Sequence, residues 1–210
     1  MERPLLRVAR VSAATILLAA ACGGEQDPAP GDVLESGAAS VYAVAGAGAL
    51  PPGREVSVML TALRNTSGEE VVIHEVEPVG VSLTSDGEAP AEVVAVELAV
   101  RDAALAEAVP LGFYPGPRPA VEVDGACVEQ PTVAAADFAL KPGGEVDEEV
   151  FLVVRVRTTA PGTFRLEGQR VVYELDGTRY HQDLRDGLEL EVREGAEPEV
   201  PDDQAACAAR

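Results

Sequence analysis

Hydrophobic and polar residues alternate with a period of two along much of the chain from about Val41 onward. The clearest example is segment 55–64, where Val56, Val58, Leu60 and Ala62 fall on one face and Ser57, Met59 and Thr61 on the other. Because successive side chains of a strand point to opposite sides, this pattern predicts a half-buried β-strand. The same alternation predicts apolar strand faces formed by Val150, Leu152, Val154 and Val156, and by Leu188, Leu190 and Val192.

Sequences that favour tight turns separate these segments. Asn65-Thr66-Ser67-Gly68 lies between the strand at 55–64 and another at 71–76, so the two are predicted to form a hairpin. Asp176-Gly177, between strands at 171–175 and 179–184, is a stronger hairpin sequence, because both residues tolerate left-handed backbone angles. We also predict a short strand at 79–84, a turn at 141–144 and a break at Pro161-Gly162.

Short strands with regularly spaced turns are typical of an antiparallel sandwich. The strings NTSGEEVVI, LKPGGE, PGTFRLEG and VVYELDG resemble, in the rhythm of their turns, the immunoglobulin-like domains of bacterial envelope proteins. The chain has no Trp, so the Cys…Trp…Cys core of antibody domains is missing. The resemblance implies an all-β, antiparallel immunoglobulin-like β-sandwich.

The middle of the chain, residues 91–117, is open to two interpretations. Residues 93–109 form either a strand followed by a short helix or one longer helix, and the alanines at 103, 104 and 106 favour helix from about Asp102. A Pro- and Gly-rich loop at 112–117 follows and carries Phe113 and Tyr114. Function often lies in such loops; the alternative is that the two rings seal the end of the sandwich.

The first 22 residues have the layout of an export signal. A basic start with Arg3, Arg7 and Arg10 precedes the apolar run 11–21, which ends in small residues before Cys22. This run is shorter than the roughly 20 residues that a stable membrane span needs. The alternatives are an ordinary secretory signal cut near Ala21, which would leave a free thiol at Cys22, and a lipid-bearing cysteine.

Ala19-Ala20-Ala21-Cys22 resembles the lipobox of bacterial lipoproteins, although Ala19 stands where that family usually has Leu. The resemblance implies lipid on Cys22 and a chain held at the outer face of the cell membrane by acyl chains. The predicted organisation is therefore a signal peptide at 1–21, a disordered tether at 22–36, the β-sandwich at 37–194 and a loose C-terminal tail at 195–210.

Two cysteines remain if Cys22 carries lipid. Cysteines outside the cytoplasm tend to pair, so we expect a disulfide between Cys127 and Cys207; the alternative is two free thiols. The pair would close a loop of about 80 residues and hold the C-terminal tail against the body.

Charge and composition exclude several classes of function. The chain has 36 Asp and Glu residues against 16 Lys and Arg, a net charge of −20, which repels phosphate backbones, so no nucleic-acid partner is expected. Aromatic residues make up only 4%, which disfavours ligands that stack on rings. There is no G-x-S-x-G sequence, and the few serines lie mostly in turns. We therefore predict no catalytic residue, no cofactor and no enzymatic activity.

Metal binding is a weaker hypothesis. The residue types of a blue-copper site are all present, as His74, Cys127, His181 and Met59, but Cys127 and His181 are too far apart in sequence to share a ligand loop. Calcium prefers oxygen ligands, which Glu145, Asp147, Glu148 and Glu149, or Asp176 with Asp183 or Asp186, would supply. No complete calcium-binding loop is present, so these acidic residues are assigned to a solvated surface and no metal ligand is predicted.

These observations favour a membrane-anchored, extracytoplasmic lipoprotein with a non-catalytic immunoglobulin-like module that binds an envelope protein or supports the envelope. Exposed strand edges and end loops are its expected contact surfaces. The alternative is a metal- or small-ligand-binding lipoprotein that handles copper or calcium.

Overall fold

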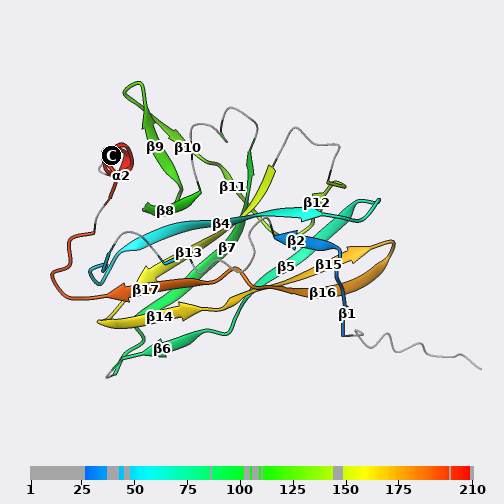
Figure 1. Cartoon of the computed structure of the whole chain (residues 1–210), viewed down its shortest axis with the longest axis horizontal. Helices are drawn as coiled ribbons and strands as arrows, with labels where there is room; N and C mark the ends of the chain where they lie inside the picture. The colour runs from blue at the N-terminus through cyan, green and yellow to red at the C-terminus, as the bar shows by residue number, and fades with distance from the viewer. Residues whose placement is uncertain are drawn as a thin grey trace, which may run out of the picture.

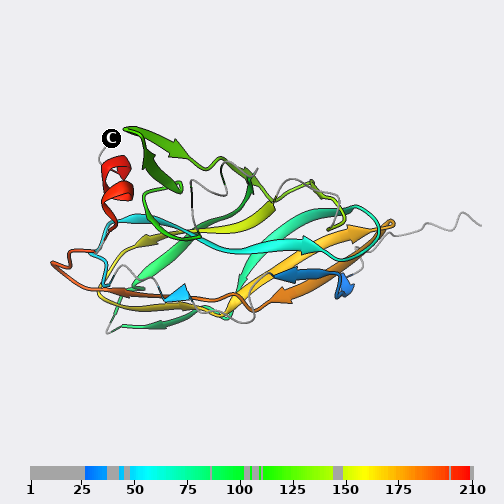
Figure 2. The same cartoon turned by 45° about the horizontal axis from the view of Figure 1, so that its top comes forward.

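The computed structural model (Figure 1) describes residues 27–36, 43–44, 48–85, 87–101, 105, 109, 111–143, 149–198 and 200–208. Strands dominate these residues and form two packed layers, with a smaller third layer on the outside of one of them (Figure 2). Cys22, the predicted lipid site, lies outside the described residues, as does the whole predicted signal peptide. No helix among the described residues is long and apolar enough to cross a membrane.

The first layer is a six-stranded sheet in the order β11-β7-β13-β4-β2, with β8 also paired to β4. Its strands are β2 (Leu34–Ser36), β4 (Glu55–Asn65), β7 (Ala91–Arg101), β8 (Gly112–Pro115), β11 (Thr132–Ala134) and β13 (Glu149–Thr158). All of its pairings are antiparallel. The central strand β13 carries the predicted apolar face of Val150, Leu152, Val154 and Val156, all of which are buried.

The second layer consists of two sheets that continue one another. One has the order β1-β16-β15-β5-β12 and the other β3-β17-β14-β6. Their strands are β1 (Ala29–Pro30), β3 (Ala43–Val44), β5 (Val71–Val79), β6 (Ser82–Thr84), β12 (Phe138–Leu140), β14 (Gly162–Leu166), β15 (Gly168–Leu175), β16 (Thr178–Leu184) and β17 (Leu188–Val192). Because β5 leads into β6, β14 into β15 and β16 into β17, the two sheets are halves of one bent layer.

The main core lies between the two layers in two clusters. One contains Leu34, Leu63, Ile73, Leu98, Leu152, Val171 and Tyr173, and the other Leu50, Val56, Val58, Val154, Phe164, Leu188 and Leu190. The prediction of an antiparallel β-sandwich is confirmed. The Asp176-Gly177 hairpin is also confirmed: both residues have positive φ, and the turn lies between the paired residues Leu175 and Thr178.

A third layer covers the outer face of the first sheet. It consists of the hairpin of β9 (Ala120–Val123) with β10 (Ala126–Glu129), and of the helix α2 (Asp202–Ala208), which packs on β9 (Figure 2). Beneath it lies a third cluster that includes Met59, Tyr114, Val121, Phe151 and Val153. The strand β4 is therefore buried on both faces, and the prediction that it is half-buried is wrong.

The predicted face of β4 is also wrong at Ala62. Met59 pairs with Val153 and Ala62 with Phe151, so two residues of β4 lie opposite Leu152 alone. Such a β-bulge reverses which face later residues occupy. As a result, Ala62 packs with the outer cluster and Leu63 enters the sandwich core.

Three further predictions need correction. Strands β4 and β5 belong to different layers, so Asn65-Thr66-Ser67-Gly68 is a corner between sheets and not a hairpin turn. The predicted tether at 22–36 is wrong for residues 27–36, because β1 and β2 pair with the sandwich and Leu34 is buried. The predicted loose tail at 195–210 is wrong for Asp202–Ala208, which form α2.

In the middle of the chain, β7 excludes one long helix over 93–109. The helix predicted from about Asp102 falls mostly outside the described residues; of its positions, Leu105 is helical and its carbonyl accepts a hydrogen bond of 2.8 Å from the Val109 amide.

Candidate functional site

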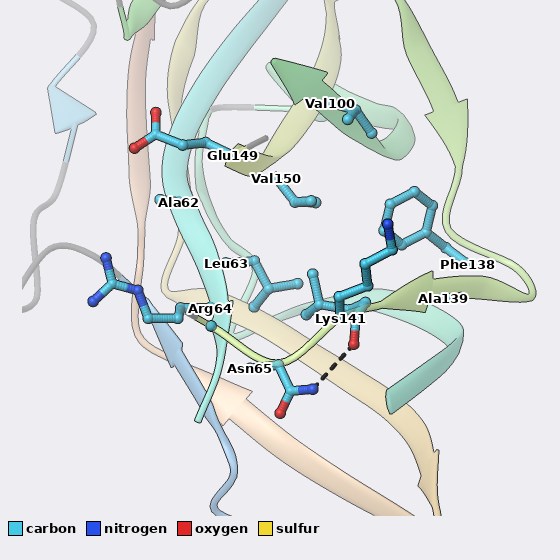
Figure 3. A pocket seen from close by; sticks show the side chains of 12 residues that line it. Ala62, Leu63, Arg64, Asn65, Val100, Phe138, Ala139, Lys141, Glu149 and Val150 are labelled. Carbon is cyan, nitrogen blue, oxygen red and sulfur yellow. Dashed lines mark hydrogen bonds between the residues drawn. The ribbon is translucent and has the colours of Figure 1, made fainter. Parts of the chain in front are cut away.

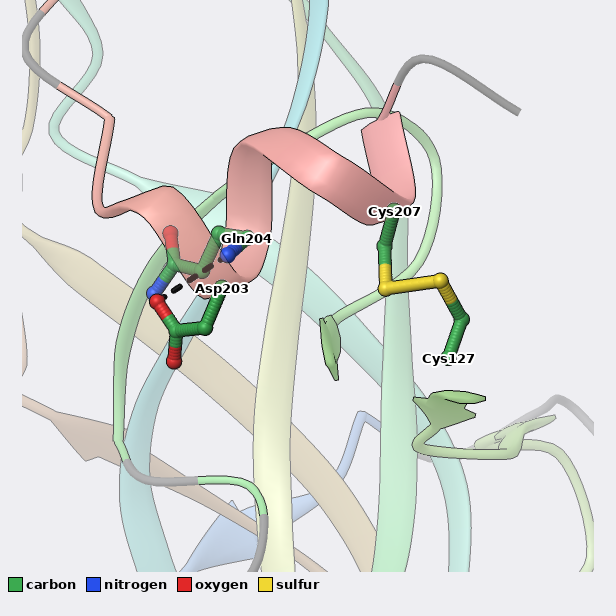
Figure 4. The surroundings of a disulfide bond; sticks show 4 residues. All are labelled: Cys127, Asp203, Gln204 and Cys207. Carbon is green, nitrogen blue, oxygen red and sulfur yellow. Dashed lines mark hydrogen bonds between the residues drawn. A yellow bond between two sulfur atoms is a disulfide. The ribbon is translucent and has the colours of Figure 1, made fainter. Parts of the chain in front are cut away.

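The predicted disulfide is present between Cys127 of β10 and Cys207 of α2 (Figure 4). The two Cα atoms lie 5.6 Å apart, and the residues are separated by 80 positions. At the start of α2, the carboxylate of Asp203 accepts a hydrogen bond of 3.0 Å from the Gln204 amide. The disulfide thus fastens the end of the chain to the third layer.

A segment that we call the C-terminal strap, the described residues 193–198 and 200–201, lies between β17 and α2. Its first amide, of Arg193, donates to the carbonyl of Leu50 at 2.8 Å. Among the described residues, the other backbone hydrogen bonds that involve the strap stay within it or join it to the first turn of α2. The strap is therefore held to the body chiefly at its two ends, by β17 and by the disulfide-linked helix.

A cavity of about 510 Å³ lies between the strap and the end of the sandwich. Its lining consists of Leu50, Gly53, Arg54, Glu55, Val56, Phe113, Pro115, Gly116, Pro198, Val200 and Ala205. Apart from Arg54, Glu55 and two glycines, these side chains are aliphatic or aromatic. Phe113, singled out by the sequence, lies in this lining and packs against the sandwich core. Tyr114 is fully buried in the outer cluster, so the alternative that both rings seal the end of the sandwich is wrong for Tyr114.

The two charged residues of this lining differ in their surroundings. The carboxylate of Glu55 lies 3.4 Å from Arg155 and 3.3 Å from Arg157. Arg54 is exposed, and its backbone amide donates to the Thr158 hydroxyl at 2.9 Å. Within the described residues the guanidinium of Arg54 has no carboxylate partner, so the lining presents one unpaired positive charge.

A second cavity, of about 410 Å³, opens where β4, β7, β12 and β13 meet (Figure 3). Its walls include Leu63, Val100, Phe138 and Val150, and its charged residues are Arg64, Lys141 and Glu149. In Figure 3 the side chains of Arg64 and Lys141, the only lysine, extend to opposite sides. With cations and a carboxylate on the same rim, this cavity favours no single class of ligand.

The strand β6 forms an edge of the second layer and has no neighbour on its outer side among the described residues. Val81, which directly precedes the strand, and Leu83 within it are each 47% exposed. Leu83 pairs with the buried Phe164, which places it on the inner face at the open rim of the sandwich.

The position of β6 is fixed by its neighbours. Gly162 has a φ of 147°, and a Cβ on it would lie 2.4 Å from the carbonyl oxygen of Thr84, so β14 can pair closely with β6 only with glycine here. Beyond β6, the hydroxyl of Ser85 donates to the carbonyl of Glu88 at 2.7 Å. The edge strand is thus held in place by contacts within the chain.

Adjacent parts of this edge carry charges and a proline that discourage pairing, whereas β6 is protected only by its short length. Strand β12 covers β5 only from Val71 to Ile73. The uncovered part of β5 carries exposed Glu75 and Glu77 and then Pro78, which lacks an amide donor. Charges and proline are the usual means by which proteins discourage strand addition, and segment 81–84 has neither.

The structure does not bring the predicted metal ligands together. Cys127 is in a disulfide and offers no thiolate, while Met59 is buried beside Arg101. His74 lies 3.3 Å from Asp137 and 3.4 Å from Glu174, whereas His181 contacts the carbonyl of Pro28 at 2.9 Å. The described residues contain no cluster of three His, Cys, Asp or Glu side chains suited to a metal. The copper hypothesis is therefore wrong for this set.

Those acidic residues proposed for calcium that lie among the described residues are also separated from one another. Asp183 is bound by Arg170, in the sixth residue pair of the hairpin from the turn at Asp176, and Asp186 is buried between β16 and β17. Glu145, Asp147 and Glu148 lie outside the described residues, and Glu149 is exposed at the start of β13.

Two buried polar side chains support the third layer. Arg101 lies with its guanidinium carbon 4.8 Å from the ring centroid of Phe151 and donates to the carbonyl of Leu105 at 3.2 Å; burial lowers its pKa. Burial also raises the pKa of Tyr114 to about 12, so the phenol stays neutral near pH 7. Tyr114 packs with Phe151 and Val153 of β13 in the outer cluster, and Arg101 of β7 lies beside the same Phe151 ring.

Sequence reasoning predicted a strand at 79–84 but did not single out its edge, and it missed Arg54. The uncharged, proline-free sequence of residues 81–84 could have indicated this edge. No sequence pattern could have indicated the position of Arg54 in the cavity lining, because that cavity is formed with the strap, which is more than 130 positions away in sequence.

No protein-family model and no curated protein matches the chain. Among solved structures, an ASH / PapD-like domain of human CEP192 aligns with 92% of this chain and 100% of that chain, at 11% identity and a TM-score of 0.35. At this TM-score the similarity assigns neither a family nor a function to the chain.

Proposed function

We propose that the chain is a membrane-anchored, extracytoplasmic lipoprotein whose β-sandwich binds, without catalysis, an extended segment of a partner protein along β6. The observation that carries this proposal is the uncharged, proline-free edge with Val81 and Leu83 exposed. An extended partner segment would pair its backbone with β6 and place alternate apolar side chains against these two residues.

The physical basis is the set of backbone groups that an edge strand leaves unpaired. Water satisfies them in the unbound protein, and an incoming strand can replace that water with directional hydrogen bonds. Because Gly162 and the Ser85–Glu88 contact already fix β6, little ordering of this strand opposes binding.

Two observations support the proposed location. Ala19-Ala20-Ala21-Cys22 resembles a lipobox, and Cys127–Cys207 is a disulfide, a bond that persists mainly outside the cytoplasm. The intact mass of the native protein tests the anchor directly. A chain that begins at a diacylated Cys22 supports the proposal, and a chain that still begins at Met1 overturns it.

Site-specific photo-crosslinking in intact cells tests the edge. A crosslinker at Leu83 is compared with one at Val133, which is 43% exposed on the other edge strand β11. We expect one crosslinked partner at Leu83, lost when Val81→Lys places a charge on the edge, and no such product at Val133. Equal crosslinking at both positions, or crosslinking unaffected by Val81→Lys, would contradict the proposal.

A second candidate function is the binding of a small ligand. The cavity beneath the C-terminal strap favours it, because small-ligand sites are mostly apolar hollows of this size with few polar groups.

A further inference from the structure

We propose that the cavity beneath the C-terminal strap binds an aliphatic monocarboxylate, with its chain against Phe113 and Val200 and its carboxylate at Arg54. This inference is independent of partner binding at β6, which lies on another part of the sandwich. It also needs no lipid on Cys22.

The shape and the lining of the cavity define the apolar part of the ligand. Strand β8 supplies Phe113 and Pro115, the strap supplies Pro198 and Val200, and α2 adds Ala205. Leu50 and Val56 form the sandwich side of the same space. Burial of an alkyl chain there removes apolar surface of both ligand and protein from water.

Charge defines the polar end. Arg54 and Glu55 are the charged residues of the lining, and Glu55 already lies between Arg155 and Arg157. A positively charged ligand near Glu55 would meet a carboxylate that already has two arginine partners. A negatively charged ligand near Arg54 would meet a guanidinium that has no carboxylate partner in the described residues. A guanidinium can donate two parallel hydrogen bonds to a carboxylate, which a neutral alcohol cannot accept in the same way.

The strap gives the site its cover. Pro198 and Val200 lie in the cavity wall, and the strap is held to the body chiefly at its ends, by β17 and by the Cys127–Cys207 link. The disulfide therefore keeps the cover over the cavity. Removing both cysteines should weaken ligand binding even where the sandwich stays folded.

Calorimetric titration tests the proposal on the full chain carrying Cys22→Ala, which cannot be lipidated. The probes are decanoate, decylamine and decanol, which share an alkyl chain and differ in charge. We expect saturable binding of decanoate, weaker binding of decanol and the weakest binding of decylamine. Arg54→Gln should weaken decanoate binding about tenfold and leave decanol binding unchanged.

Matched variants distinguish binding at this cavity from a general effect of net charge or of misfolding. Arg118→Gln removes a cation that pairs with Glu129 outside the cavity and should leave decanoate binding unchanged. Val200→Ser tests the apolar wall without altering a strand, and circular dichroism confirms that each variant is folded. Absence of saturable decanoate binding, equal affinity for decanoate and decylamine, or an Arg54→Gln variant with unchanged decanoate affinity would overturn the proposal.

Discussion

The side-chain amide of Asn65 donates a hydrogen bond of 3.0 Å to the carbonyl of Leu140, which joins the end of β4 in one layer to the edge strand β12 of the other (Figure 3). The same amide donates to the carbonyl of Glu69 at 2.7 Å, and its oxygen accepts from the Ser67 amide at 2.9 Å. The buried side chain of Asn65 thus shapes the corner that leads from β4 to β5, and it also attaches β12 to this corner.

Replacing Asn65 with Ala should destabilise the fold by about 1 to 3 kcal/mol, because it leaves buried backbone carbonyls without their donor. Urea unfolding should show a lower midpoint with an unchanged slope. Thr66→Ala is the matched control: its hydroxyl bonds to the carbonyl of Val33 in the same corner, but the residue is exposed. An equal loss of stability in both variants would show that the Leu140 contact has no special role.

Loss of the disulfide should lower stability by about 4 to 5 kcal/mol, the chain-entropy value for a closed loop of this length. The double variant Cys127→Ala/Cys207→Ala should unfold at the same urea concentration as the reduced native protein and well below the oxidised one. The comparison isolates the covalent link, because reduction changes no side chain. A double variant as stable as the oxidised protein would mean that α2 is held by packing alone.

Local patterns predicted the parts of the fold that depend on local sequence. The Asp176-Gly177 turn specifies its hairpin because two adjacent residues set the backbone angles. The inner face of β13 was readable because apolar residues occupy every second position from Val150 to Val156.

The mispredicted parts depend on distant segments. The bulge in β4 that moves Ala62 to the outer face arises from pairing with β13, almost 90 residues later. The corner at Asn65 reads like a hairpin turn, and only the register of β5 with β15 assigns its strands to different layers. The cavity beneath the strap likewise needs the disulfide, β8 and the sandwich end together, so its ligand class could not be inferred from Phe113 alone.

Asp186 should make stability depend on pH. Its carboxyl is buried between β16 and β17, and burial raises its pKa above the ordinary 3.8, against a smaller opposite effect of the nearby Ser36 hydroxyl. A raised pKa means that the folded protein binds the proton more tightly than the unfolded chain. The stabilising effect of the proton is complete below the unfolded pKa and is lost as pH rises through the folded pKa.

Asp186→Asn should therefore be more stable than the native protein at pH 7, by about 1 kcal/mol, the scale of one buried polar group. Its advantage should shrink as the pH falls through the folded pKa of Asp186 and should be smallest below the ordinary value of 3.8, where the native carboxyl is protonated as well. Thermal unfolding of both proteins across this range measures the difference. A constant difference at every pH would mean that the Asp186 charge is not the cause.

Arg170 should hold the pKa of the Asp183 carboxyl below its usual value through two hydrogen bonds, of 2.7 and 2.9 Å, across the β15–β16 pair. A lowered pKa stabilises the fold above the unfolded pKa, and this contribution disappears as pH falls through the folded pKa. Both side chains are substantially exposed, so Arg170→Gln should change stability at pH 7 only slightly. An NMR titration should instead show the Asp183 pKa rising towards 3.8 in Arg170→Gln and unmoved in Arg179→Gln, a variant of the same hairpin. If both variants moved the Asp183 pKa equally, its cause would be the general charge of the sheet and not the paired guanidinium.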